Sequence, residues 1–105
     1  MKLIKTDIEG VFIIEPRLFE DDRGYFFESF SLSKFRDLSG LNTTFVQDNE
    51  SRSREGVVRG LHFQLPPYAQ SKLVRVVEGE ILDVAVDIRR GSPTFGRSVA
   101  VVLSA

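Results

Sequence analysis

The sequence contains no cysteine and no tryptophan among its 105 residues. Without cysteine, a disulfide framework, a thiolate nucleophile and a cysteine-ligated zinc site are all excluded, and a reducing, cytoplasmic setting is expected. No apolar run approaches the roughly 18 residues that a membrane helix needs, and the first ten residues contain no apolar secretory core. We therefore expect neither membrane insertion nor export.

An excess of charge of either sign is also absent. The chain has 14 Lys and Arg against 15 Asp and Glu, which gives a formal net charge of −1. Nucleic acids and anionic membranes are held by basic surfaces, so neither is an expected partner. Hydrophobic residues make up 42% and charged residues 28%, which is typical of a globular protein and not of a disordered chain. The length fits one domain covering residues 1–105.

Short β-rich runs recur along the chain, each bounded by turn-forming residues, and this pattern predicts an all-β sandwich or barrel. One short helix is expected between Phe30 and Gly40, with Ser33 as its cap and Gly40 as its end. The expected strands cover residues 11–17, 24–30, 43–47, 57–64, 72–77, 81–88 and 97–103. The last run stops on Ala105, so we expect a barrel that is incomplete at its C-terminal end.

Residues 72–88 form a candidate hairpin. If Glu78 and Gly79 are its two-residue loop, one face of residues 81–88 is purely apolar, while the other carries Asp83 near Lys72. These two residues would be diagonal neighbours with backbones about 7–8 Å apart, which their side chains can bridge. The pair is either an ordinary ion pair on a solvated face or part of a polar site, and a bulge at Gly79 would remove the pairing.

The chain has a single histidine, His62, within VVRGLHFQL. Strict alternation places His62 and Gln64 on one face and Arg59 on the other. Gly60 marks either a bulge or a place where a ligand approaches the backbone closely. An isolated histidine in a strand is most often a hydrogen-bonded structural imidazole, so its role depends on the residues around it.

The spacing of Gly56, His62, Gln64, Lys72 and Gly79 resembles the first motif of the cupin superfamily, which frames a metal site on a small β-barrel. Gln64 stands where the second histidine of that motif would be, and Lys72 stands where its carboxylate would be. One histidine beside a cation cannot hold zinc, iron or manganese. We therefore expect a barrel without metal or other cofactor.

Four strings, DDRGYFFESF, FVQDNESRS, VVRGLHFQ and KLVRVVEGEILDVAVDIRRGSPTFG, resemble the dTDP-4-dehydrorhamnose 3,5-epimerase family. The resemblance runs through essentially the whole chain. It implies a cupin-like jelly-roll barrel in a homodimeric, cytoplasmic, cofactor-free enzyme. Such an enzyme inverts C3 and C5 of dTDP-4-dehydro-6-deoxy-D-glucose to give dTDP-4-dehydro-L-rhamnose.

The resemblance also implies roles for individual residues. His62 matches the catalytic base, and Lys72 and Arg59 match positions that contact the sugar and the diphosphate. Either Phe26 or Phe27 could stack on thymine, although core packing is the more ordinary interpretation of both. The remaining matches to substrate-contacting positions are Arg23, Glu28, Gln47, Asp48 and Asn49.

The residues present suit this chemistry. Both inverted carbons lie beside the C4 ketone, so removal of either proton gives an enolate. An imidazole with an unperturbed pKa of about 6.5 can act as the base at neutral pH. The Lys72 ammonium could stabilise the enolate oxygen, and Asp83 beside it would favour the charged lysine.

The family's general acid, a tyrosine, and the aspartate that orients its histidine match positions beyond Ala105, and neither Tyr25 nor Tyr68 replaces the acid. A truncated, catalytically impaired module that binds dTDP-sugars or dimerises is therefore one alternative. An epimerase acting only at C3 or only at C5 of another dTDP-4-keto sugar is a second. A metal-dependent cupin is disfavoured by Gln64 and Lys72.

Overall fold

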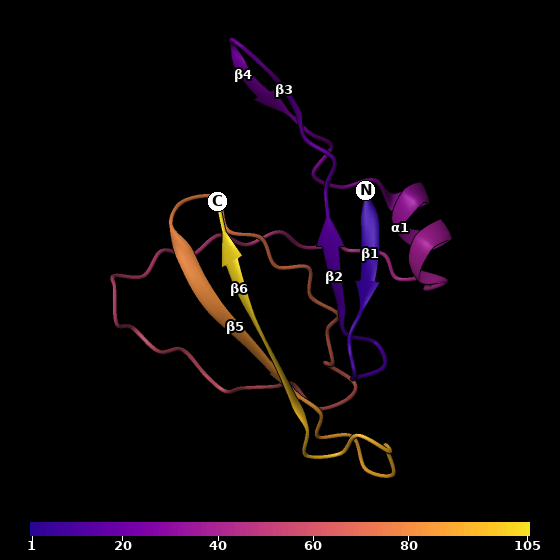
Figure 1. Ribbon diagram of the computed structural model, residues 1–105. Helices are drawn as coiled ribbons and strands as arrows, with labels where there is room; N and C mark the ends of the chain where they lie inside the picture. The colour runs from indigo at the N-terminus through magenta and orange to yellow at the C-terminus, as the bar shows by residue number, and fades with distance from the viewer. The chain divides into compact units, whose positions relative to one another are not determined.

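The computed structural model describes all 105 residues, and they fall into two units. Unit 1 comprises Met1–Asn42 and Arg75–Ala105, and unit 2 comprises Thr43–Val74. All the regular structure, six strands and one helix, lies in unit 1 (Figure 1). The expectation of an all-β chain with one short helix is confirmed.

The first hairpin joins β1 (Lys2–Lys5) to β2 (Phe12–Glu15) as antiparallel strands. Strand β2 lies inside the run expected at 11–17, whereas β1 was not expected. The connection between them is closed by Thr6, whose hydroxyl lies 2.9 Å from the carbonyl oxygen of Val11 and accepts from the Ile8 N–H at 3.2 Å. Ile8 is buried beneath this turn and begins the small core of unit 1.

Helix α1 (Leu32–Ser39) contacts β1. Its N-cap is Ser31 and not Ser33, because Ser31 has the extended backbone that a cap needs and its hydroxyl accepts from the Lys34 N–H. The expected end at Gly40 is confirmed: Gly40 has φ of 71° and donates its N–H to the Arg36 carbonyl at 2.9 Å. Phe35 is the buried residue of the helix.

The second hairpin joins β3 (Phe19–Asp21) to β4 (Gly24–Phe26) through a two-residue loop. In Figure 1 it extends beyond the end of β2. Its aromatic residues are largely exposed, with Phe19 at 52% and Phe26 at 70%. The Arg17 guanidinium lies 4.8 Å from the centre of the Phe19 ring, so a cation covers part of this apolar surface.

The third hairpin joins β5 (Glu80–Val86) to β6 (Ser98–Ser104), with Asp83 opposite Val101. The expected hairpin between residues 72–77 and 81–88 is therefore wrong, since β5 pairs with a strand that follows it and residues 72–77 form no strand. Beyond the last pair of the ladder, the Ala105 N–H donates to the Gly79 carbonyl at 3.0 Å. Gly79 is thus joined to the end of β6 instead of closing the expected hairpin loop.

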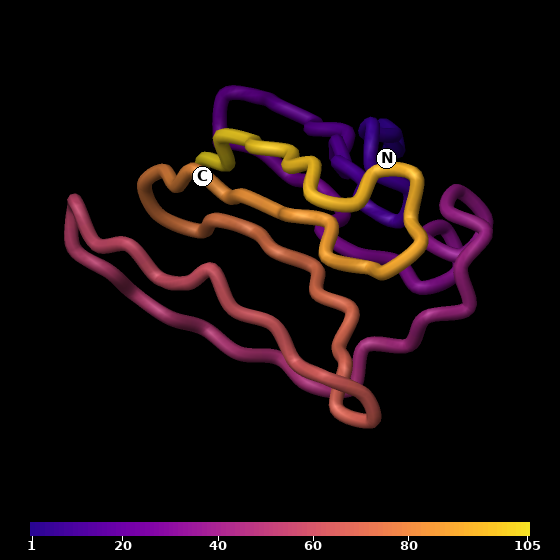
Figure 2. The backbone as a smooth tube through the Cα atoms, turned by 90° about the horizontal axis from the view of Figure 1, so that it is seen from below, coloured from indigo at the N-terminus to yellow at the C-terminus, as the bar shows by residue number.

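Unit 2 is irregular, so the strands expected at 43–47 and 57–64 are not formed. One of its turns is closed by the Val57 N–H, which donates to the Arg54 carbonyl at 3.3 Å. Two arms of the chain run away from this turn, as Figure 2 shows. A strand requires a neighbour that takes up its backbone N–H and C=O groups, and β-forming residues alone do not supply that neighbour.

Candidate active site

Six of the expected site residues lie together in unit 2, and all six are exposed. They are Gln47, Asp48, Asn49, Arg59, His62 and Lys72. The base and the cations assigned to the sugar and diphosphate are therefore carried by irregular segments and not by strands. Side chains on such segments are accessible to solvent, as binding residues on loops commonly are.

The backbone at Gly60 determines where the His62 imidazole lies. Gly60 has φ of 101°, a conformation that residues with a side chain rarely adopt. A Cβ atom at this position would lie 3.0 Å from Nδ1 of His62, so the ring occupies the space that any other residue would fill. The group close to Gly60 in the structure is thus the ring of His62, and the expected approach of a ligand to this backbone stays a prediction.

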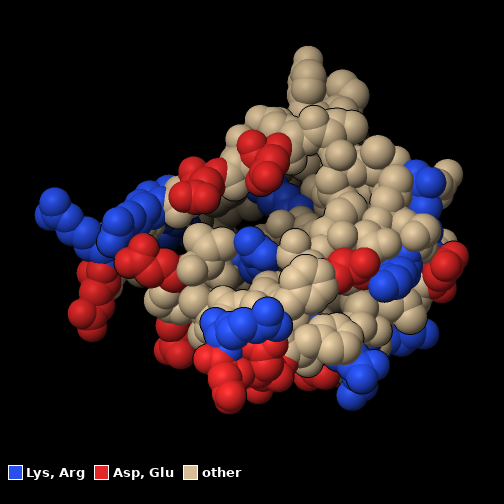
Figure 3. Space-filling model, turned by 90° about the horizontal axis from the view of Figure 1, so that it is seen from above, with Lys and Arg blue, Asp and Glu red and all other residues tan.

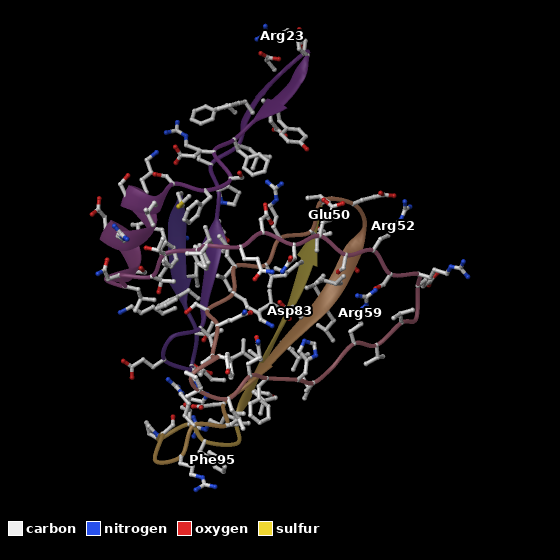
Figure 4. The ribbon with its side chains drawn as sticks, turned by 180° about the vertical axis from the view of Figure 1, so that it is seen from behind. Arg23, Glu50, Arg52, Arg59, Asp83 and Phe95 are labelled. Atoms are coloured by element: carbon white, nitrogen blue, oxygen red, sulfur yellow. The ribbon has the colours of Figure 1, made fainter.

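Arg59 joins the two arms of unit 2. Its Nη2 donates to the carbonyl oxygen of Arg52 at 3.1 Å, and Figure 4 shows the two arginines on opposite arms. Because Gly60 interrupts the extended backbone between Arg59 and His62, strict alternation does not apply across this step. The argument that placed these two side chains on opposite faces therefore no longer holds.

Gln47 and Asn49 interact within the same arm. The Gln47 Nε2 donates to Oδ1 of Asn49 at 3.3 Å, while both residues remain exposed. The amide of Asn49 still has its own donor group, and the carbonyl of Gln47 is an acceptor. The segment expected to contact substrate therefore presents both donors and acceptors to solvent.

The other expected site residues lie in unit 1. Arg23 is at the end of the β3–β4 hairpin (Figure 4), with its side chain 90% exposed. Its guanidinium donates to both carboxylate oxygens of Asp21, the shorter contact being 2.6 Å. This pairing raises the pKa of Arg23 and lowers that of Asp21. A ligand phosphate at Arg23 would compete with the Asp21 carboxylate.

Glu28, Phe26 and Phe27 follow the same hairpin. Glu28 accepts from Nζ of Lys34 at 2.8 Å, which links the segment after β4 to helix α1. Phe27 is half-buried, with its ring 5.9 Å from that of Tyr25 and the Arg75 guanidinium 5.9 Å from its centre. Phe27 is thus used in packing, while the exposed Phe26 is the aromatic residue available to a base.

Asp83 lies in the middle of β5 and is half-buried (Figure 4). The hairpin that would have placed it beside Lys72 is not formed, and the two residues belong to different units. The sequence argument for an ion pair between Asp83 and Lys72 therefore no longer holds, and the ion pair stays a prediction.

Sequence reasoning gave no role to Asp87, although its surroundings are the most developed polar cluster of unit 1. The Asp87 side chain is fully buried at 0% exposure. It accepts from the backbone N–H and both ends of the guanidinium of Arg89, from the Ser92 hydroxyl at 2.6 Å and from the Thr94 hydroxyl at 2.7 Å. These donors hold the pKa of Asp87 far below its usual range. The signal in the sequence was the repeated spacing Asp-x-Arg at 21–23 and 87–89.

Charge is not separated by sign on the face that Figure 3 shows. Acidic and basic side chains are interspersed on the face shown in Figure 3, in keeping with the near-zero net charge. None of the helices has the length and apolar character required to cross a membrane.

Comparison with known proteins finds matches along nearly the whole chain. A family model described as dTDP-4-dehydrorhamnose 3,5-epimerase matches residues 5–105. The dTDP-4-dehydrorhamnose 3,5-epimerases of Shigella flexneri and Escherichia coli are 59% and 57% identical over all 105 residues. The chain covers 58% and 57% of their respective lengths, so it spans little more than half of these relatives.

Solved structures agree with the sequence matches. The crystal structure of dTDP-4-dehydrorhamnose 3,5-epimerase from Elizabethkingia anophelis matches 99% of this chain with a TM-score of 0.93 and 54% identity, over 57% of its own chain. The dTDP-6-deoxy-D-glucose-3,5-epimerase of Legionella pneumophila, solved with dTDP-4-keto-L-rhamnose, matches 98% with a TM-score of 0.91 and 53% identity, over 54% of its own chain. The path of this chain is therefore that of the corresponding part of cupin-type epimerases.

Proposed function

Because the chain belongs to the dTDP-4-dehydrorhamnose 3,5-epimerase family, we propose that it carries the proton-abstracting part of an isomerase that converts dTDP-4-dehydro-6-deoxy-D-glucose to dTDP-4-dehydro-L-rhamnose. The observation that carries this proposal is the match of the whole chain, at up to 59% identity, to enzymes of that name. The relative from Bacillus anthracis was solved with TDP and PPi bound, which supports a nucleotide-diphosphate ligand.

His62 is the proposed base. The protons at C3 and C5 of the substrate are acidified by the neighbouring C4 ketone, and a neutral imidazole can remove them at working pH. The ring is exposed and lies against Gly60, so its approach to a substrate carbon is governed by the local backbone. Inversion follows when a donor on the other side of the sugar, which in this chain is solvent water, gives a proton to the opposite face of the enolate.

Lys72 is the proposed stabiliser of the enolate oxygen. Its ammonium group supplies a fixed positive charge, and removal of one such electrostatic donor typically costs about 10²- to 10³-fold in rate. Asp83 is proposed to support the charged form of Lys72. No metal ion is required in this scheme, because charge stabilisation and proton abstraction both come from side chains.

The remaining assignments concern substrate binding. The planar guanidinium groups of Arg59 and Arg23 suit the diphosphate, since each donates two hydrogen bonds to neighbouring oxygens. The exposed Phe26 is proposed to stack on thymine. The polar residues proposed to complete the binding surface are Glu28, Gln47, Asp48 and Asn49. We further propose a cytoplasmic homodimer, as the family resemblance implies, and sedimentation equilibrium tests the dimer.

The test of the reaction is hydrogen exchange. The protein is incubated with dTDP-4-dehydro-6-deoxy-D-glucose in D₂O, and deuterium at C3 and C5 is followed by NMR. Exchange with inversion at both carbons is expected. Inversion at one carbon alone would indicate a 3- or 5-epimerase instead. Exchange without inversion would show a base acting without its acid, and a bound sugar that exchanges at neither carbon would support the binding module.

Two variants make this test specific. His62→Asn should abolish exchange at both carbons, since no other histidine is present in the chain. Gln64→Ala, two residues away, should retain it and serves as the matched control. Exchange that persists in His62→Asn at the wild-type rate would remove His62 from its proposed role. Lys72→Met should slow exchange, and Lys72→Arg should recover part of it because the charge is kept.

A further inference from the structure

The connection between β5 and β6, residues 87–97, is closed by hydrogen bonds that centre on Asp87. The backbone N–H of Asp87 donates to the Arg97 carbonyl at 2.9 Å, and its carbonyl accepts from the Gly96 N–H at 2.7 Å. Inside the loop, the Arg97 N–H donates to the Thr94 carbonyl at 2.9 Å. Asp87, the first residue after β5, is thus bonded to the residues just before β6.

The Asp87 carboxylate fixes the interior of the same loop. Its oxygens accept from Arg89 on one side and from the hydroxyls of Ser92 and Thr94 on the other. The Ser92 hydroxyl also accepts from the Thr94 N–H at 3.3 Å. A buried acceptor with this many donors specifies one loop conformation, because any other leaves buried polar groups without partners.

Strand β5 specifies its register only weakly. On β6 the half-buried residues alternate with exposed ones, with Val99, Val101 and Leu103 on one face, so this strand has one preferred buried face. On β5 the half-buried residues 83–85 are consecutive and apolar residues occur on both faces, so this strand has no single buried face. A one-residue slip in a hairpin exchanges its two faces, and patterning opposes such a slip where one face is buried. The β5 side of the register is therefore left to the loop.

We infer that Asp87 is a positioning residue that sets the register of β5 against β6 and thereby keeps Asp83 opposite Val101 on the half-buried face. Asp83 lies four residues before Asp87, the first residue after β5. A slip of one residue would turn Asp83 to the side of the hairpin now occupied by Leu82 and Val102, which are 65% and 58% exposed. The consequence for catalysis rests on the proposed function, whereas the register itself does not.

Engineered disulfides test the register directly, because the chain has no cysteine of its own. Leu82 and Val102 are partners in the ladder, so the pair Leu82→Cys with Val102→Cys reports the native register. Leu82→Cys combined with Val101→Cys or with Leu103→Cys reports slips in the two directions. In the otherwise unchanged chain, mild oxidation should link the first pair and leave the other two reduced.

Asp87→Asn should change this ratio. The amide keeps the size of the carboxylate but removes its charge and replaces one acceptor by a donor. We expect the ratio of native to slipped cross-links to fall by about tenfold or more, since several charge-assisted hydrogen bonds are lost together. A ratio that stays within about twofold of the unchanged chain would overturn the inference.

Thr94 supplies a second, milder test in case Asp87→Asn does not fold. Thr94→Val has nearly the same shape but lacks the hydroxyl, whereas Thr94→Ser keeps it. Thr94→Val should shift the cross-link ratio in the same direction by a smaller factor, and Thr94→Ser should restore it. Equal ratios in these two variants would contradict a role for the donors around Asp87.

The effect on catalysis is measured separately. If the proposed function holds, Thr94→Val should lower kcat for deuterium exchange with KM little changed, and Thr94→Ser should recover it. A shifted register with no exchange in any variant, including the unchanged chain, would leave the register inference standing and reject the proposed function. A native register with lowered kcat would reject the inference instead.

Discussion

The turns at Asp21–Arg23 and Asp87–Arg89 have the same spacing and the same hydrogen bonds, yet very different surroundings. In each, the aspartate accepts from the backbone N–H and the guanidinium of the arginine two residues later. At the first turn the side chains of Arg23 and Asp21 are 90% and 52% exposed. At the second, Arg89 is 55% exposed and Asp87 is fully buried.

The difference comes from residues further along the chain. Ser92 and Thr94 bring two hydroxyl donors to Asp87 and close its loop over it, and nothing equivalent follows Asp21. Water screens the exposed pair, so it contributes little to stability, whereas a buried carboxylate depends on every donor that replaces water. The same three-residue motif is therefore exposed in one place, where ligand contact is proposed for Arg23, and forms a buried part of the fold in the other.

The two turns should differ most in thermal stability when the charge of each aspartate is removed. Asp87→Asn should lower Tm strongly, because Arg89, Ser92 and Thr94 lose their common acceptor in a buried site. Asp21→Asn should change Tm by no more than an ordinary surface substitution does. Thermal unfolding followed by circular dichroism compares the two variants. Equal losses of Tm would show that burial is not what distinguishes the turns.

Acid should remove the same interaction reversibly. The donors around Asp87 depress its pKa in the folded state, so its contribution is complete above the unfolded pKa of about 3.9 and is lost as pH falls below that value. The urea midpoint of the unchanged chain should therefore drop more steeply between about pH 4 and pH 2 than that of Asp87→Asn. Asp21→Asn should keep the steep drop, and a flat profile in all three proteins would contradict this account.

Substitutions of the two arginines should affect different properties, with Arg23 affecting substrate binding and Arg89 affecting stability. Arg23→Gln should raise KM for the dTDP-sugar by roughly tenfold or more while Tm stays unchanged, since its proposed partner is the ligand. Arg89→Gln should lower Tm and leave KM unchanged, since its partner is Asp87. Steady-state kinetics and thermal unfolding of both variants provide the measurements. The assignment of Arg23 fails if its KM stays at the wild-type value.

The local parts of the fold could be predicted from the sequence. Gly40 ends α1 because a left-handed C-cap is a property of that residue and its immediate neighbours. Strand β5 was expected from its apolar alternation and is present, but its partner was not identified correctly. The hairpin with residues 72–77 was inferred from a nearby turn, whereas pairing with β6 depends on the Asp87 loop, whose closure involves residues up to ten positions apart.

For the candidate site, the identity of the residues could be predicted from the sequence better than their geometry. His62 could be singled out as the only histidine, and Gly60 beside it was expected to mark an unusual backbone. The position of the imidazole over Gly60 could not be derived, because it depends on a backbone angle that alternation assumes to be extended. The pairing of Lys72 with Asp83 rested on a hairpin between residues 72–77 and β5, and the choice of a strand's partner depends on residues far along the chain that local patterning does not identify.

Ser92 offers the finest test of the comparison between the turns. Ser92→Ala removes one hydroxyl donor from Asp87 but leaves Arg89 and Thr94 in place, so about 1 kcal/mol of stability should be lost. Ser33→Ala, on the exposed side of α1, is the matched control and should stay within about 0.5 kcal/mol of the unchanged chain. Urea unfolding of both variants resolves a difference of this size. If Ser92→Ala proves as stable as its control, the loop hydroxyls do not hold Asp87, and the two turns differ only in exposure.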